Sequence, residues 1–213
     1  MLKKILLGIG AVLGLAVVGV CGAAAMAPDE LHIERSATFA AQPADISPFL
    51  TDMKAFADWN PWRDYEPTAT LGFSENPSGV GAWYTWKGEE IGSGKMIVAS
   101  ASENKVEHDL EFIEPFPSKA DITFSLTPEG EGTKVTWAMD EKQDFMGKMF
   151  GVFMNMDEML GGDFAKGLAK LKPKAEEAAK QRVEAEATAK AEAEAAAAAA
   201  AVADGAVVEV PVQ

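Results

Sequence analysis

Three successive segments between residues 105 and 140 alternate apolar and polar side chains, and this pattern constrains the fold more than any other feature of the chain. In the first segment the inward positions are Val106, His108, Leu110 and Phe112, and every residue between them is acidic. A period of two residues is typical of β-strands with one buried face. Because short turns separate the segments, the sequence predicts an antiparallel meander with one face toward solvent.

Further elements are predicted from the positions of apolar residues, prolines and turn residues. The expected strands are residues 31–40, 68–73, 82–87, 91–102, 105–113, 119–128 and 133–140, and the expected helices are residues 43–58 (as one or two short helices) and 146–171. The last helix is expected to end at Pro173, and its apolar stripe would cover the dry face of the sheet. The predicted fold class is α+β, with a strongly curved antiparallel sheet gripping a long C-terminal helix.

The composition divides the chain into an apolar leader at residues 1–27, a domain at 28–173 that holds every Trp and Tyr, and an Ala- and Glu-rich tail at 174–213. The domain is long enough to bury a core of its own. Alanine favours helix, but the tail has no large apolar stripe. We therefore expect a solvated helix or spacer that does not pack on the domain and that finishes in a disordered end. The sequence does not identify a protein partner for the tail.

Residues 5–27 carry no charge, and this span is long enough to cross a bilayer as a helix. Lys3 and Lys4 precede it and two acidic residues follow it. The positive-inside rule then places the N-terminus in the cytoplasm and the domain on the non-cytoplasmic (periplasmic) side of a single-pass membrane protein. Two alternatives stay open: cleavage as a signal peptide near Met26 or Pro28, and lipidation at Cys21, the one cysteine of the chain.

The charge balance excludes one class of partner. The chain has a net charge of −14, and residues 28–173 contain 13 Lys and Arg against 25 Asp and Glu. Nucleic acid binding needs a basic patch or stripe, and this acidic domain has none. The same balance argues against electrostatic docking on anionic lipids. We expect the acidic surface to serve solubility.

Several short motifs in this chain occur together in one group of proteins. They are Trp59-Asn60-Pro61-Trp62 after a predicted helix, Gly79-Val80-Gly81, Trp86-Lys87-Gly88, Glu114-Pro115-Phe116 and the helical segment at residues 156–172. With the predicted order of elements, this set resembles the START-like helix-grip superfamily, and within it the polyketide cyclase/dehydrase group, also called SRPBCC proteins. The resemblance covers residues 31–172. It implies binding of a lipid, sterol, polyketide or other apolar ligand, while the activity is not implied by the fold.

Large side chains on the inner sheet face and on the closing helix are the predicted ligand-binding residues. They are Trp62, Trp83, His108, Phe112, Phe124, Trp137, Met139, Phe153 and Met156. In a regular strand only one of Trp83 and Trp86 can point inward. The alternative interpretation is that these rings pack a dry core. The methionines between residues 146 and 159 would suit an adaptable cavity lining or an irregular core equally well.

His108 is the strongest single candidate for acid–base chemistry, because the alternating pattern predicts that its side chain points inward. Three roles are open: a structural hydrogen bond, orientation of a polar group on a ligand, and general base catalysis, with Asp157 or Tyr84 as a partner. The sequence shows no metal-ligand spacing and no phosphate-binding loop before a helix. We therefore expect neither a metal site nor a cofactor.

The sequence thus predicts a membrane-anchored binding protein for a small or medium hydrophobic ligand, lipid-like or polyketide-like, held between the sheet and the C-terminal helix. The second hypothesis is an enzyme of the cyclase/dehydrase type that uses His108. The third is a non-binding interaction module whose contact element is the tail.

Overall fold

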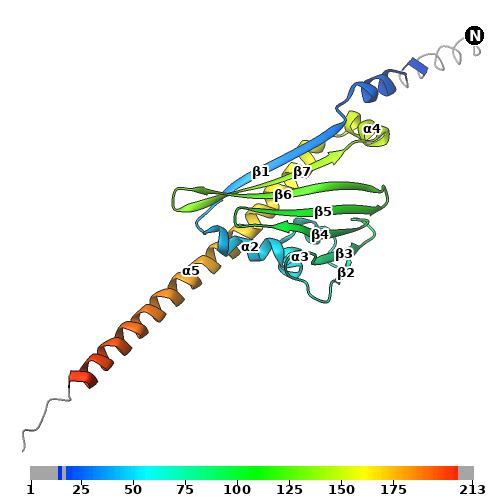
Figure 1. Ribbon diagram of the computed structural model, residues 1–213. Coiled ribbons are helices and arrows are strands. Elements are labelled where there is room, and N and C mark those ends of the chain that lie inside the picture. Colours follow the sequence, from blue (N-terminus) through cyan, green and yellow to red (C-terminus); the bar gives the residue numbers. More distant parts are fainter. Residues whose placement is uncertain (1–13, 16–17, 206–213) are drawn as a thin grey trace, which may run out of the picture.

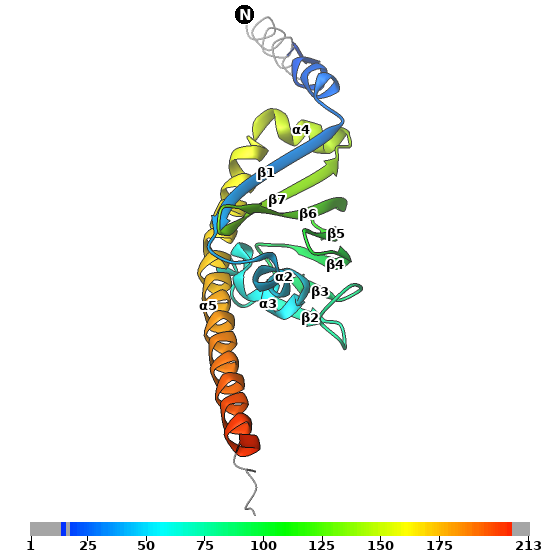
Figure 2. The same ribbon diagram turned by 60° about the vertical axis from the view of Figure 1, so that its left-hand side comes forward.

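The computed structural model describes residues 14–15 and 18–205. In chain order its elements are β1 (Glu30–Phe39), α2 (Pro43–Thr51), α3 (Met53–Trp59), the 3-10 helix η1 (Pro61–Asp64), β2 (Thr70–Phe73), β3 (Trp83–Lys87), β4 (Ser93–Ala101), β5 (Lys105–Glu114), β6 (Ser118–Glu129), β7 (Gly132–Lys142), α4 (Phe145–Phe153) and α5 (Met156–Gly205). The seven strands form one antiparallel sheet in the order β1-β7-β6-β5-β4-β3-β2. Helices α2, α3 and α5 lie on one side of this sheet (Figure 1). The sheet curves around them, as the turned view in Figure 2 shows. The α+β class is therefore confirmed.

The inner face of the meander is apolar, as the alternation predicted. Its buried side chains are Val106, His108, Leu110, Ala120, Ile122, Phe124, Leu126, Val135, Trp137 and Met139. Strand register places His108 opposite Ile122 and Phe124 opposite Trp137. The pairing of β4 with β5 contains two register shifts. Such irregularities bend a strand and increase its twist, which contributes to the curvature of the sheet.

The predicted helical region after β1 is divided into two helices at Asp52. The backbone of Asp52 is extended, and its Oδ1 accepts hydrogen bonds from the backbone N–H groups of Lys54 (2.9 Å) and Ala55 (3.0 Å). This is an N-cap, so α3 begins where α2 ends. Helix α3 buries Phe56 and Trp59 against the sheet, and the Trp59 indole N–H donates to the Phe49 carbonyl at 2.9 Å. These bonds fix the segment that leads into η1.

The prediction of one helix over residues 146–171 is wrong at its start. Helix α4 ends at Phe153, Met154 is extended, and α5 begins at Met156. The Asn155 side-chain oxygen accepts from the Glu158 N–H at 3.2 Å, which caps the new helix. The apolar spacing continues across this break, so periodicity alone could not reveal it.

The prediction that Pro173 ends the helix is also wrong, because α5 continues through it to Gly205. Proline removes one backbone hydrogen bond from a helix interior. The residues that follow are almost all strong helix formers. In addition, Ala175 and Ala179 are buried against the domain, so tertiary packing holds the helix beyond the proline.

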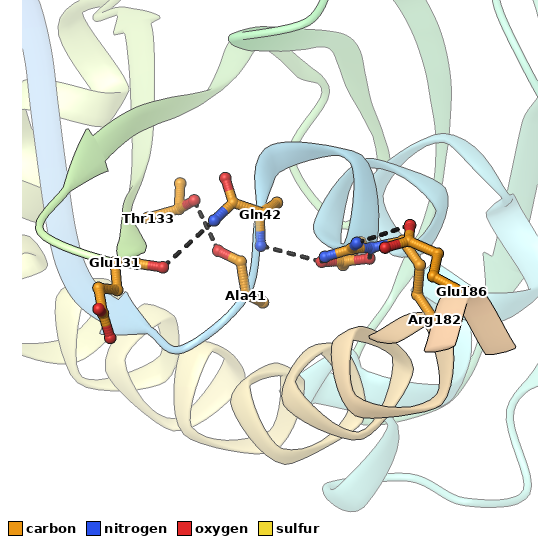
Figure 3. A network of polar contacts seen from close by, with 7 residues as sticks. Ala41, Gln42, Glu131, Thr133, Arg182 and Glu186 are labelled. Carbon is orange, nitrogen blue, oxygen red and sulfur yellow. Dashed lines mark hydrogen bonds and ion pairs between the residues drawn. The ribbon is translucent and has the colours of Figure 1, made fainter. Parts of the chain in front are cut away.

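The tail therefore does not stand free of the domain over its whole length, contrary to the sequence prediction. Arg182 Nε donates to Asp45 Oδ1 at 2.7 Å, and Asp45 Oδ2 accepts from the Gln42 N–H at 3.0 Å. Gln42 Nε2 in turn donates to the Glu131 carbonyl at 3.2 Å, which extends the network to the β6–β7 turn (Figure 3). Residues 183–200 are helical and solvent-exposed. Glu186, one turn after Arg182, forms an ion pair with it. The solvated part of the helix is therefore residues 183–200.

Within residues 14–15 and 18–205, no helix is both long enough and apolar enough to cross a membrane. Residues 18–26 are helical. Residues 1–13 and 16–17, which make up much of the predicted anchor, lie outside the described part of the chain, as does the predicted disordered end beyond residue 205. The anchor therefore stays a prediction.

Candidate functional site: a cavity between the sheet and helix α5

A cavity of about 400 Å³ lies between the sheet, the η1 region and the first turns of α5. Its volume is within the range of about 300–1,000 Å³ that is typical of small-molecule pockets. Its apolar walls come from elements that are far apart in the sequence. They are formed mainly by Trp62, Leu71, Trp86, Met96, Leu110, Phe112, Ile122, Trp137, Met139, Leu160 and Phe164.

The wall that α5 provides approaches the sheet very closely. The rings of Trp137 and Phe164 are stacked with centroids 4.4 Å apart and an interplanar angle of 4°. Gly167 follows Phe164 by three residues on the same helix. A Cβ at Gly167 would lie 2.6 Å from the Trp137 ring. Contacts this short do not occur between real atoms, so glycine is needed for the helix to pack at this distance.

The inner part of the cavity contains one polar pair, Asn60 and Tyr84. Both side chains are buried, and Asn60 Nδ2 donates to the Tyr84 hydroxyl oxygen at 3.0 Å. The Asn60 side-chain oxygen accepts from the Trp62 N–H at 3.0 Å. Burial raises the pKa of Tyr84, which keeps the phenol neutral and able to donate its hydrogen. The described residues provide no acceptor for that hydrogen, so a ligand oxygen or nitrogen could accept it.

The outer rim of the cavity is polar and includes Arg63, Tyr65, Glu66 and Glu90. The Glu66 carboxylate accepts from the backbone N–H groups of Glu89 (2.8 Å), Glu90 (2.9 Å) and Ile91 (3.2 Å). These bonds lower the pKa of Glu66 and hold the β3–β4 turn against the rim.

Tyr65 connects the opposite side of the rim to α5. Its hydroxyl donates to Asp163 Oδ1 at 2.6 Å and accepts from Lys166 Nζ at 2.7 Å. Asp163 is buried, while Tyr65 is about half exposed. An apolar interior with a hydrogen-bonded polar rim is the usual architecture of a site for an apolar or amphipathic ligand.

A family model described as polyketide cyclase/dehydrase and lipid transport matches residues 30–176, about two thirds of the chain. The chain belongs to this family. The resemblance to the START-like SRPBCC group is thereby confirmed, over nearly the same residues as the motifs covered. A search of curated proteins gave no match.

Solved structures share the fold of this polyketide cyclase/dehydrase family member at low sequence identity. The KanY protein matches with a TM-score of 0.51 at 18% identity, over 69% of this chain and 98% of its own. A protein from Rhizobium leguminosarum matches with a TM-score of 0.51 at 11% identity, over 70% of this chain and 95% of its own. Protein CV1439 from Chromobacterium violaceum matches with a TM-score of 0.50 at 15% identity, over 70% of this chain and 99% of its own. At these identities the likeness shows the fold alone.

Four of the nine predicted ligand-binding residues of this family member line the cavity: Trp62, Phe112, Trp137 and Met139. Phe124 is fully buried in the core, where its ring lies 5.1 Å from that of Trp137, so it supports the wall from behind. Their role in binding a ligand stays a prediction.

Trp83 does not line the cavity, contrary to the sequence prediction. It lies on the outer face of β3, where Lys95 Nζ is 4.9 Å from its ring centroid. Its neighbours Tyr84 and Trp86 point inward instead. The inward face is fixed by the Asn60–Tyr84 hydrogen bond and by Gly94, where a Cβ would lie 2.2 Å from the Trp86 ring.

His108 is buried but lies outside the cavity lining. Its Nε2–H donates to the Leu50 carbonyl at 2.9 Å, and Nδ1 has no partner among the described residues. Burial lowers the pKa of His108 to about 4, so the imidazole is neutral near pH 7. Of the three roles that the sequence left open, this geometry favours the structural hydrogen bond.

Phe153 and Met156 lie at a second, more open groove of about 540 Å³, between α4, the start of α5 and residues 27–31. Phe153 is 70% exposed, and no other residue of α4 is buried either. Asp157 is at the same groove and pairs with Arg35 through two N–O distances of 3.0 Å, which lowers the pKa of the carboxyl. Asp157 lies at this groove and Tyr84 lines the cavity, and His108 is hydrogen-bonded to the Leu50 carbonyl rather than to either of them.

Several cavity residues were not predicted, namely Asn60, Tyr65, Leu71, Trp86, Leu160 and Phe164. Asn60 and Trp86 belong to motifs that the sequence did single out, so their motif position was the available signal. Within the described residues, no group of three or more His, Cys, Asp or Glu side chains is arranged to hold a metal ion.

Proposed function

We propose that this protein binds a small or medium hydrophobic ligand, lipid-like or polyketide-like, in the cavity between the sheet and α5. The observation that carries the proposal is a cavity of about 400 Å³ with apolar walls and the buried, hydrogen-bonded Asn60–Tyr84 pair. Membership of a family described by polyketide cyclase/dehydrase chemistry and lipid transport supports the same ligand classes.

The binding free energy would come mainly from burial of apolar surface. Transfer of apolar area from water contributes roughly 25 cal/mol per Å². A ligand that buries about 200 Å² of apolar area would therefore gain about 5 kcal/mol before the cost of immobilisation is subtracted. The Tyr84 hydroxyl, oriented by Asn60, would select ligands that place an oxygen or nitrogen acceptor at the inner end of the cavity.

The decisive experiment fills the cavity with a larger side chain of the protein itself. Leu110 lines the cavity on β5, whereas Ile113 on the same strand is solvent-exposed. Native mass spectrometry of the full-length protein should detect a co-purifying apolar molecule in the wild type and in Ile113→Trp, but not in Leu110→Trp. Melting temperatures of the three proteins would separate loss of the site from loss of the fold.

The other two hypotheses have their own outcomes in this experiment. Turnover of the bound molecule that disappears in His108→Gln would favour the cyclase/dehydrase-type enzyme, although His108 lies outside the cavity lining. Absence of any bound molecule, together with no saturable binding to a broad panel of lipids and polyketides, would favour the interaction module.

We further propose that residues 5–27 anchor the protein in a membrane, with the domain on the non-cytoplasmic (periplasmic) side. The uncharged length of this span and the lysines before it support the proposal. The full-length protein should sediment with membranes and resist extraction by high salt. A mature soluble form that begins near Met26 or Pro28 would contradict the anchor.

A further inference from the structure

Helix α4 and the residue after it expose a cluster of large apolar side chains. None of the residues of α4 is buried. The exposed large side chains of this segment are Phe145, Met146, Phe150, Val152, Phe153 and Met154. Phe116, from the turn between β5 and β6, extends the surface, because its ring centroid lies 5.1 Å from that of Phe150. We call these seven residues the α4 face. Contiguous exposed apolar patches on soluble domains usually mark a contact with a membrane or another molecule.

The α4 face is free of the acidic residues that dominate the rest of the chain. Residues 145–154 contain one charged residue, Lys148, and no Asp or Glu, although the whole chain has a net charge of −14. Lys148 forms an ion pair with Asp29. Repulsion from anionic lipid headgroups is therefore lower over residues 145–154 than over the acidic rest of the domain, and insertion of these side chains themselves desolvates no carboxylate.

The α4 face also lies where the apolar leader meets the domain. The Gln143 N–H donates to the Asp29 carbonyl at 2.8 Å, next to the start of α4. Ala27 and Pro28 share the second groove with Val152 and Phe153. In both views, residues 18–26 and α4 are at one end of the molecule, while α5 extends toward the opposite end (Figures 1 and 2).

We propose that the α4 face rests in the interfacial layer of the lipid bilayer from which the leader emerges. An exposed helix with Phe and Met side chains and no acidic residue suits the boundary between headgroups and acyl chains. The inference rests on the anchor proposed above, because the anchor would bring this end of the domain to the membrane and raise the local lipid concentration. The domain would then have a fixed orientation, with the distal part of α5 directed away from the membrane.

The test places a polarity-sensitive dye at the α4 face of the full-length protein. In a Cys21→Ser background, Phe153→Cys carries a thiol-linked NBD group, and Val80→Cys is the matched control. Phe153 and Val80 are both exposed apolar residues, at 70% and 64%, but Val80 lies in the loop between β2 and β3. Each protein is reconstituted into phosphatidylcholine–phosphatidylglycerol vesicles with or without nitroxide-labelled lipid, and flotation of the vesicles is measured in parallel.

We expect both proteins to float and nitroxide lipids to quench the label at 153 several-fold more than the label at 80. Flotation with equal, weak quenching at both sites would overturn the α4 face as a lipid contact and leave the anchor intact. A blue shift at 153 without quenching by nitroxide lipids would mean that a second copy or another protein segment covers the face, which also overturns the proposal. Failure to float would overturn the anchor, and the membrane contact with it.

Discussion

The imidazole of His108 is held in an aromatic environment. Its ring centroid lies 5.3 Å from that of Phe56 and 5.6 Å from that of Phe124. A protonated ring in this position would lose its hydration without gaining a carboxylate partner among the described residues. At the residue scale, this makes His108 a source of acid sensitivity.

We predict that His108 destabilises the fold in mild acid. Its folded-state pKa of about 4 is below the ordinary value of 6.5, so the unfolded chain takes up the proton first. Its contribution to stability is therefore complete above pH 6.5 and is lost as the pH falls toward 4, by up to about 3 kcal/mol. Urea unfolding between pH 7 and 4 should show a weaker pH dependence for His108→Gln than for the wild type.

His32 provides the control for this experiment. It is exposed, and a hydrogen bond with Asp140 raises its pKa, so its contribution has the opposite sign and is lost as the pH rises. Because His32 stabilises the fold at low pH, His32→Gln should show an acid sensitivity at least as large as that of the wild type. Identical slopes for wild type and His108→Gln would contradict the assignment of this sensitivity to His108.

Tyr84→Phe tests the polar pair inside the cavity. Removal of the hydroxyl should weaken binding of a ligand with a hydrogen-bond acceptor by about 1 kcal/mol, roughly fivefold in Kd, and leave binding of a pure hydrocarbon nearly unchanged. Titration by tryptophan fluorescence with matched ligands would measure both. Equal weakening for the two ligands would indicate that the change acts through packing rather than through the hydrogen bond.

At the scale of elements, the approach of α5 to the sheet depends on Gly167. We predict that Gly167→Ala lowers the free energy of unfolding by about 1–3 kcal/mol, because the added Cβ would overlap the Trp137 ring. Gly162→Ala in the same helix meets no atom within 4 Å, and it should stabilise the protein by up to about 1 kcal/mol through helix propensity. Chemical denaturation of both variants measures these free energies of unfolding. Equal changes for the two variants would mean that only helix propensity, and not packing against Trp137, differs from the wild type.

The proximal tail should contribute to stability, which reverses the expectation from sequence. Truncation after residue 173 removes buried Ala175 and Ala179 and leaves Asp45 without Arg182. We predict a loss of about 1–3 kcal/mol, since an unpaired buried carboxylate is unfavourable and Arg182 itself is partly exposed. Truncation after residue 190 should leave the melting temperature nearly unchanged. A similar loss in both truncations would show that the exposed distal helix also stabilises the domain.

At the scale of the whole molecule, the sequence could predict most of the sheet. Residues 105–140 alternate so regularly that the buried face followed directly, and the motif around Trp59 indicated the family. Strand β3 has aromatic residues on both faces, so its pattern could not distinguish Trp83 from Trp86. The inward face of β3 is decided by Asn60, which is distant in sequence, and by Gly94 on the neighbouring strand β4.

Other features depended on contacts that no local pattern encodes. Alanines carry little hydrophobic signal, yet Ala175 and Ala179 are buried because small side chains permit close packing. The Asp45–Arg182 pair joins residues 137 positions apart. The break between α4 and α5 depends on the Asn155 cap, which interrupts an otherwise continuous apolar stripe and leaves Phe153 exposed.

One helix forms both a wall of the cavity and the arm that leaves the domain. Leu160 and Phe164 touch the cavity near the start of α5, and the same helix continues to Gly205. Beyond Arg182, where its contacts with the domain end, this arm is on the order of 35 Å long at about 1.5 Å per residue. If the helix stays straight, a tilt of about 5° at Arg182 would carry its far end through about 3 Å. A change at the cavity would reach that far end only through the Ala175, Ala179 and Arg182 contacts that clamp the helix to the domain.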